Sequence, residues 1–155
     1  MNTSKPDLKD KIQADLYQAM RNRDKIRISV LRMLRSSIGY EEIETKAELK
    51  DVSVIDIISR QVRQRRESIN IYREGGRNDL VDKESEELSI LQEYLPLQLT
   101  TEELTNLARD VIIEIGATTL TDKGKVMGQL MPQVRGKADG NQVNEVVTAL
   151  LNQAN

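Results

Sequence analysis

Carboxylates and basic side chains are the main chemically active groups of this sequence, because histidine and cysteine are both absent from its 155 residues. Their absence rules out a Ser-His-Asp triad, a Cys-His pair and zinc sites built on thiolate or imidazole ligands. The sequence therefore predicts no metal site and no bound cofactor.

The carboxylates occur in adjacent pairs, namely Glu41-Glu42, Glu86-Glu87 and Glu102-Glu103. Neighbouring residues on a helix point about 100° apart, so such a pair cannot serve as acid and base on one substrate. The segment Gly124-Lys125-Val126 is not a phosphate loop, since the upstream glycine and the following Ser or Thr are missing. We therefore expect no catalytic residue in the chain.

Basic side chains gather in two places. One group lies near the C-terminus, where acidic residues are few, and comprises Lys123, Lys125, Arg135 and Lys137. The other is a run of arginines whose spacing favours one stripe on a helix, made of Arg60, Arg63, Arg66 and Arg73. Either group can contact phosphates. Either also fits a solvated surface, where an exposed ion pair contributes about 0 to 1 kcal/mol.

Apolar residues recur at helical spacing along the chain, and no alternating strand pattern competes with them. Asp7, Asp79 and Asp139 are N-cap candidates, while Gly75-Gly76 and Gly116 are candidate stops. Weaker start signals are the capping-box pattern of residues 53–56 and the threonines at 100 and 101. Helices are expected over residues 7–21, 24–44, 53–74, 79–95, 101–115, 122–132 and 140–150, with Pro132 either bending or ending the helix that begins near residue 122.

The core must be aliphatic, because the sequence has no Phe or Trp and only four tyrosines. Pro96 and the threonines after it interrupt the helical pattern. The sequence thus predicts an all-α fold with a long-helix region over residues 1–95 and a smaller helical bundle over residues 96–155.

The most distinctive segment is Gly124-Lys125-Val126-Met127-Gly128-Gln129-Leu130-Met131-Pro132, followed by Arg135-Gly136-Lys137-Ala138-Asp139-Gly140. Together with Val30-Leu31-Arg32-Met33-Leu34 and Glu93-Tyr94-Leu95-Pro96, it makes nearly the whole chain resemble the stand-alone YqeY type of the GatB/YqeY family. In that family a similar tail domain, in the B subunit of the glutamine-dependent tRNA amidotransferase, helps to hold tRNA while another domain does the chemistry. The resemblance implies an all-α protein in two parts.

The residues of this distinctive segment, and Asn144 after it, also have a purely structural interpretation. Gly124 and Gly128 are four apart, so they favour close approach of a neighbouring helix. Gly136 suits a turn and Asp139 can cap the last helix, while Asn144 is placed to bond the backbone near that turn.

We expect a non-catalytic RNA-binding module, with tRNA as the partner that the resemblance implies. Two alternatives stay open: a protein-interaction adaptor in the translation or amidotransferase machinery, and an accessory subunit of a carbon-nitrogen ligase with glutamine as amide donor. The net charge of −2 gives no global attraction to nucleic acid, so binding must rest on local charge. The polar N-terminus and the lack of an apolar run of about 20 residues predict a cytoplasmic protein without a membrane span.

Overall fold

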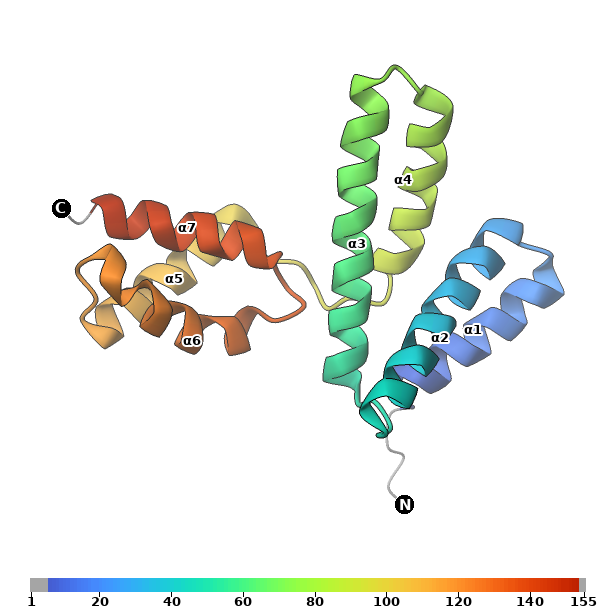
Figure 1. The fold of residues 1–155 in the computed structure, drawn as a ribbon, viewed down its shortest axis with the longest axis horizontal. Helices are drawn as coiled ribbons and strands as arrows, with labels where there is room; N and C mark the ends of the chain where they lie inside the picture. The colour runs from blue at the N-terminus through green and yellow to red at the C-terminus, as the bar shows by residue number, and fades with distance from the viewer. Residues whose placement is uncertain (1–5, 154–155) are drawn as a thin grey trace. The chain divides into compact units, whose positions relative to one another are not determined.

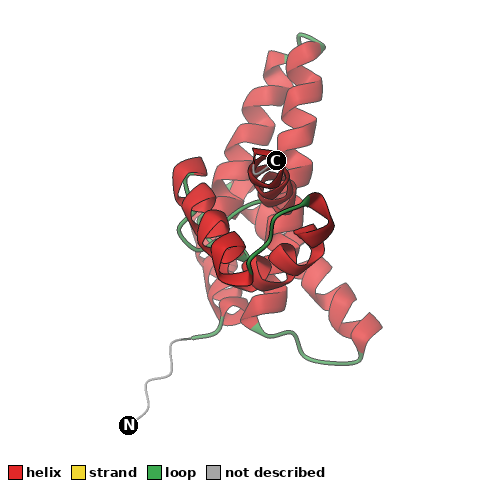
Figure 2. Cartoon of the chain, turned by 90° about the vertical axis from the view of Figure 1, so that its left-hand side faces the viewer, coloured by secondary structure: helices red, strands yellow, loops and turns green. Residues whose placement is uncertain are grey.

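The structure of this protein is a computed structural model that describes residues 6–153 (Figure 1). Helices joined by turns make up this part of the chain, which contains no strand (Figure 2). The predicted all-α fold is confirmed. No helix among the described residues has the length and apolar character needed to cross a membrane. The chain folds into two compact units, Met1–Leu95 and Pro96–Asn155.

The N-terminal unit consists of two helical hairpins (Figure 1). Helices α1 (Leu8–Asn22) and α2 (Lys25–Thr45) form the first, and α3 (Asp51–Glu74) and α4 (Asn78–Gln92) form the second. Their apolar stripes meet in one core whose most buried side chains include Ile12, Leu31, Leu34, Ile58 and Leu91. This core is aliphatic, as predicted, except for Tyr94 at its edge.

Local sequence signals explain most helix ends in this unit. The Asp7 side chain accepts a hydrogen bond from the Asp10 backbone N–H at 2.8 Å, which confirms Asp7 as an N-cap. Asp24 caps α2 in the same way, with Arg27 N–H at 3.1 Å. The glycine pair does end α3, and Gly76 has φ +70°, a conformation that costs a residue with a side chain more than it costs glycine.

Two predicted helix starts in this unit are wrong. Helix α3 begins at Asp51, two residues before Ser53, and its N-cap residue Lys50 makes no side-chain cap hydrogen bond. In place of a local cap, the Asp51 carboxylate holds this start to α1 by accepting the Leu8 backbone N–H at 2.9 Å. Helix α4 begins at Asn78, and Asp79 lies inside its first turn. The Asp79 carboxylate receives two hydrogen bonds from the Arg77 guanidinium, at 3.2 and 3.0 Å. Tertiary and neighbouring partners therefore replaced the caps expected from the sequence.

The end of α4 is fastened to the first hairpin by polar contacts. Tyr94 is 5% exposed, and its hydroxyl donates to the Asp15 carboxylate at 2.5 Å. Burial, together with this hydrogen bond, raises the pKa of Tyr94. Arg27 of α2 makes a two-pronged contact with Glu93, at 2.7 and 3.0 Å. These contacts fix the point at which the N-terminal unit ends.

The C-terminal unit contains α5 (Thr101–Ile115), the short 3₁₀ helix η1 (Leu120–Asp122), α6 (Lys123–Val134) and α7 (Gly140–Gln153). Thr100 and Glu103 form a reciprocal capping box at the start of α5, as predicted. Gly116 ends α5 at φ +74°. The three α-helices enclose a second aliphatic core that includes Leu104, Val126, Leu130, Val147 and Leu151.

Pro132 neither ends α6 nor lies at its last residue, because the helix continues to Val134. Pro132 has no N–H to donate to the Gly128 carbonyl, so α6 lacks one backbone hydrogen bond, yet the helix extends two residues beyond the proline. Of the two effects expected at Pro132, a bend or an end of the helix, the structure therefore excludes the end.

Candidate functional site

Helix α6 separates the four basic residues that the sequence places near one another. Lys123 and Lys125 lie in its first turn, whereas Arg135 is its C-cap and Lys137 follows in the next turn. The 12 residues of α6 extend over about 18 Å at 1.5 Å per residue. The structure thus forms two basic pairs at opposite ends of one helix, and does not bring the four side chains together around a turn.

These two pairs make α6 the basic helix of the C-terminal unit. It contains no acidic residue, whereas α5 carries four and α7 carries one. Lys125, Arg135 and Lys137 are exposed and Lys123 is half-buried. Within residues 6–153, none of the three lysines has a carboxylate within 4.0 Å. Their charges are therefore available to a ligand.

Asp122 is the acidic side chain closest to the first basic pair. Its carboxylate accepts the backbone N–H groups of Thr118 and Thr119, at 2.9 and 3.2 Å. These hydrogen bonds, with a smaller contribution from Lys125, lower the pKa of Asp122 below its ordinary value. Asp122 is therefore ionised at neutral pH and offsets part of the positive charge at the start of α6.

The two glycines of α6 do not serve the packing role predicted for them. Gly124 and Gly128 are exposed, and a Cβ built at either position meets no atom within 4 Å. No helix of the C-terminal unit lies against them, so the expectation of a close helix contact is wrong within this unit. Gly124, Gly128 and Pro132, all exposed, follow one another at intervals of four residues, so they form a row on α6 without long side chains, next to Lys125.

The turn between α6 and α7 is held to the segment that precedes α5. Gly136 is buried at φ +76° and its carbonyl accepts from the Gln98 side-chain amide at 2.7 Å. The Lys137 carbonyl accepts the Leu99 N–H at 2.8 Å. The Gly136 turn is confirmed, and these bonds fix the backbone that carries the second basic pair.

Of the structural roles predicted for Asp139 and Asn144, the structure confirms the first and not the second. Asp139 accepts the Asn141 N–H at 2.8 Å and caps α7, as predicted. Asn144 is exposed on α7, and its side chain makes no hydrogen bond with any residue that the structure describes. The expected contact of Asn144 with the nearby backbone is therefore absent.

The arginines of α3 point in different directions. Arg60 and Arg66 are exposed and Arg63 is half-buried, and none of the three has a carboxylate within 4.0 Å among the described residues. They span about 120° of the helix surface, so the stripe is broad. Arg65, by contrast, is 9% exposed and turns inward.

Arg65 joins α3 to α4 through two glutamates. Its guanidinium contacts the Glu84 carboxylate at 3.0 Å and makes a short contact with Glu87, which is itself buried. One buried cation is thus shared by two carboxylates. This group closes the second hairpin and leaves neither glutamate free to work on a substrate.

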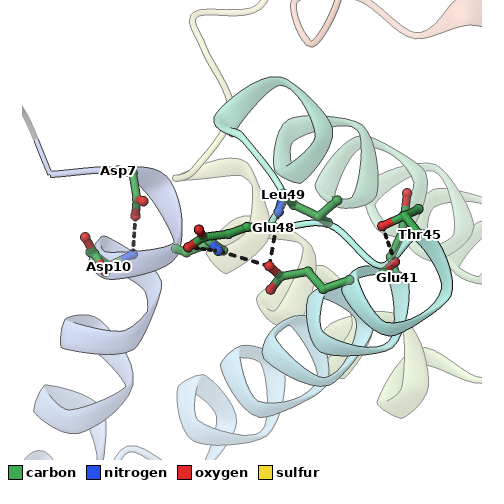
Figure 3. Close-up of polar contacts among 8 residues, drawn as sticks. Asp7, Asp10, Glu41, Thr45, Glu48 and Leu49 are labelled. Carbon is green, nitrogen blue, oxygen red and sulfur yellow. Dashed lines mark hydrogen bonds and ion pairs between the residues drawn. The ribbon is translucent and has the colours of Figure 1, made fainter.

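A second charged network joins the start of α1, the last turns of α2 and the segment between α2 and α3 (Figure 3). The Lys9 ammonium contacts Glu42 at 3.1 Å and Glu48 at 3.0 Å. The Leu49 N–H donates to the same Glu42 carboxylate at 3.1 Å. This backbone hydrogen bond, followed by the bond from Lys9, lowers the pKa of Glu42. This network therefore stabilises the packing of the N-terminal unit.

In each adjacent glutamate pair, one member is engaged in a structural contact with another part of the chain. Glu42 and Glu87 hold Lys9 and Arg65, and Glu103 belongs to the capping box of α5. In the part of the chain that the structure describes, no group of three or more acidic residues is placed to hold a metal ion.

An exposed apolar row on α2 was not among the site residues predicted from the sequence, which were chosen mainly for their charge. Ile26, Met33 and Tyr40 are 38%, 51% and 66% exposed, and they follow one another at intervals of seven residues. Met33 and Tyr40 also line an open groove of about 720 Å³ between α2 and α3. The signal that could have revealed this row is an apolar repeat beside the buried stripe of the same helix.

The sequence matches known proteins over most of its length. The family described as Yqey-like protein matches residues 9–151. A Pyrenophora tritici-repentis protein named "Altered inheritance of mitochondria protein 41, mitochondrial" is 28% identical over 135 residues, which cover 83% of this chain and 71% of that protein. Proteins of the same name from Vanderwaltozyma polyspora and Eremothecium gossypii are 34% and 36% identical over 85 residues. Those matches cover 54% of this chain but only 46% of each relative.

The prediction of a cytoplasmic protein is wrong, because these relatives are named as mitochondrial proteins. It rested on the lack of an apolar secretory signal. Mitochondrial targeting segments are amphipathic and rich in arginine, so a search for apolar runs cannot distinguish a cytoplasmic from a mitochondrial protein.

Proposed function

Since the chain belongs to the Yqey-like protein family, which is related to the C-terminal domain of GatB, we propose that it is a non-catalytic RNA-binding protein that contacts tRNA. Helix α6 provides the main contact surface. The observation that carries the proposal is the position of four basic residues at the two ends of a helix that contains no acidic residue.

The contact is with the RNA backbone and not with the bases. All four tyrosines of the chain belong to the N-terminal unit, so the C-terminal unit has no aromatic side chain on which an unpaired base can stack. Lysine and arginine side chains bind phosphates irrespective of sequence. The exposed glycine face between the basic pairs lets an RNA backbone approach the helix closely.

The arginines of α3 are a second and competing contact surface. Arg60, Arg63 and Arg66 are free of ion pairs with described carboxylates, as the lysines of α6 are. They belong to the other unit, however, and the acidic Glu67 directly follows Arg66 in the sequence. We therefore assign them a supporting role.

The test is a titration of labelled tRNA with the full chain at several salt concentrations, read by fluorescence anisotropy. The variant Lys123→Ala, Lys125→Ala, Arg135→Ala, Lys137→Ala should bind several-fold more weakly. Its plot of log affinity against log salt should be shallower by about 0.7 to 0.9 for each lost phosphate contact. Arg109→Ala is the matched control, because it removes the fifth basic residue of the same unit from α5.

Three results would contradict parts of this proposal. A loss in log affinity for Arg109→Ala that is about a quarter of the loss for the fourfold variant would mean that only the net charge of the unit matters, because the variants remove one and four positive charges. Loss of binding in the triple variant of Arg60, Arg63 and Arg66, with the α6 variant unaffected, would move the site to α3. Absence of salt-dependent tRNA binding by the unmodified chain would refute RNA binding itself.

A further inference from the structure

The exposed apolar row of α2 has the spacing of a helix-to-helix contact. Ile26, Met33 and Tyr40 recur every seven residues, and the row extends over about 21 Å of the helix. Ser29 and Ser36 lie exposed between them, and their small size permits close approach of a second helix. Single exposed apolar residues need no explanation, whereas a continuous row indicates a partner.

The same row forms one wall of the groove between α2 and α3. Met33 and Tyr40 come from α2, and Arg60 and Gln61 come from the facing side of α3. The groove is open to solvent and holds about 720 Å³. A helix that packs along the apolar row would therefore have this groove beside it, where its side chains can enter.

The charges along α2 define which helix fits. At the start of α2, Arg23 and Lys25 flank the N-cap Asp24, whose charge is paired with Arg27, so this end has a net positive charge. Its last turns carry Glu41 and Glu44, which have no lysine or arginine within 4.0 Å among the described residues. Acidic residues at a helix C-terminus are unfavourable unless a cation meets them. Arg60 supplies one positive charge on the facing wall against these two negative charges.

We propose that the partner is a second copy of this chain, with the two α2 helices packed antiparallel around a two-fold axis at Met33. This alignment places Ile26 of one copy opposite Tyr40 of the other, and position 25 opposite position 41. The basic start of each α2 then meets the acidic end of its partner. A parallel pair would instead oppose like charges at both ends, so the charge pattern selects the antiparallel one.

Such a contact is self-complementary, as a closed two-fold dimer requires. A stable dimer buries about 800 Å² on each partner, and one helix row with part of a groove supplies less than that. The expected association is therefore reversible, with a dissociation constant in the micromolar range.

The first experiment measures self-association of the full chain by sedimentation velocity over a dilution series. The variant Ile26→Ala, Tyr40→Ala should raise the dissociation constant at least about tenfold, since truncation of central aromatic and aliphatic contacts has the largest effects. Ile71→Ala is the matched control, because Ile71 is 66% exposed, as Tyr40 is, but lies on α3 outside the row. Circular dichroism melting verifies that each variant is folded.

The second experiment exchanges the charges. A variant with Arg23→Glu and Lys25→Glu opposes acid to acid, and a variant with Glu41→Lys and Glu44→Lys opposes base to base. Each alone should be monomeric where the unmodified chain is dimeric. An equal mixture should form a heterodimer, because both ends are then complementary. No other partner, and no folding defect, produces this pattern.

Three outcomes would overturn the proposal. The unmodified chain could remain monomeric at every concentration reached, or Ile71→Ala could weaken association as much as the double variant does. Finally, the mixture of charge-exchanged variants could stay monomeric. In the last case, an α2-mediated contact with a different protein would be the better explanation of the row.

Discussion

Replacement of Gly128 by alanine should stabilise the C-terminal unit. Gly128 lies in the middle of α6, is exposed, and has no atom within 4 Å of a Cβ at that position. Alanine restricts the unfolded chain and favours the helix, which is worth about 0.5 to 1 kcal/mol at such a site. Gly124, in the first turn, should add less. The double variant should therefore gain about 1 kcal/mol.

A gain of this size is measurable by thermal unfolding. In a unit of about 60 residues, 1 kcal/mol raises Tm by about 4 to 8 °C. Two controls set the scale. Gly39→Ala, also in a helix and also without neighbours within 4 Å, should give a similar gain in the N-terminal unit. Gly116→Ala should lower Tm, because its φ of +74° costs an L-residue about 1 to 2 kcal/mol.

A lower Tm for Gly128→Ala would refute this reasoning, because it would require an atom of the folded chain close to Gly128. The same variant also bears on function. Under the RNA-binding proposal, added methyl groups on α6 stand between the helix backbone and the RNA. The double glycine variant should then bind tRNA more weakly although it is more stable, whereas Gly39→Ala should leave tRNA affinity unchanged.

Two further predictions concern the charged networks. The folded chain holds the pKa of Glu42 below its ordinary value, so the stability that Glu42 contributes is present above about pH 4.3 and is lost as the pH falls through the folded pKa. Urea midpoints measured from neutral to acid pH should therefore fall less steeply for Glu42→Gln than for the unmodified chain; equal slopes would exclude this role. Arg65→Met should destabilise the chain by about 3 to 5 kcal/mol, because it leaves Glu84 and Glu87 without their cation. Adding Glu84→Gln and Glu87→Gln should recover most of that loss in chemical unfolding, and no recovery would show that the charges are not its cause.

Helix positions were predictable because the apolar period and several caps act locally. Asp7, Thr100 and Asp139 use their own side chains on the next turn of backbone, so the sequence alone specifies them. The starts of α3 and α4 were not predictable in this way. There Asp51 bonds the backbone of α1, and Asp79 bonds Arg77, so contacts outside the helix determine the outcome.

For Arg65 of α3, the sequence specifies the side of the helix on which it lies but not the residues that it contacts. Arg65 lies seven residues after Ile58 and four before Ile69, both buried, so the helical period already placed it on the inner face. The prediction grouped the arginines of α3 by charge alone, and so did not use the spacing that places Arg65 with the buried isoleucines. The partners of Arg65 on α4, Glu84 and Glu87, depend on how the second hairpin packs and could not be derived from the period of α3.

The separation of the basic pairs on α6 could have been inferred from the helix prediction itself. Residues 123 and 137 are close in sequence, but the helix between them holds their side chains apart by about its own length. The predicted helix of residues 122–132 and a single group of four basic side chains were therefore incompatible, and the structure shows the helix. With about 18 Å between Lys123 and the end of α6, the two pairs must contact different phosphates. A flat stretch of RNA backbone or the two edges of a groove satisfies that requirement, whereas a single phosphate group does not.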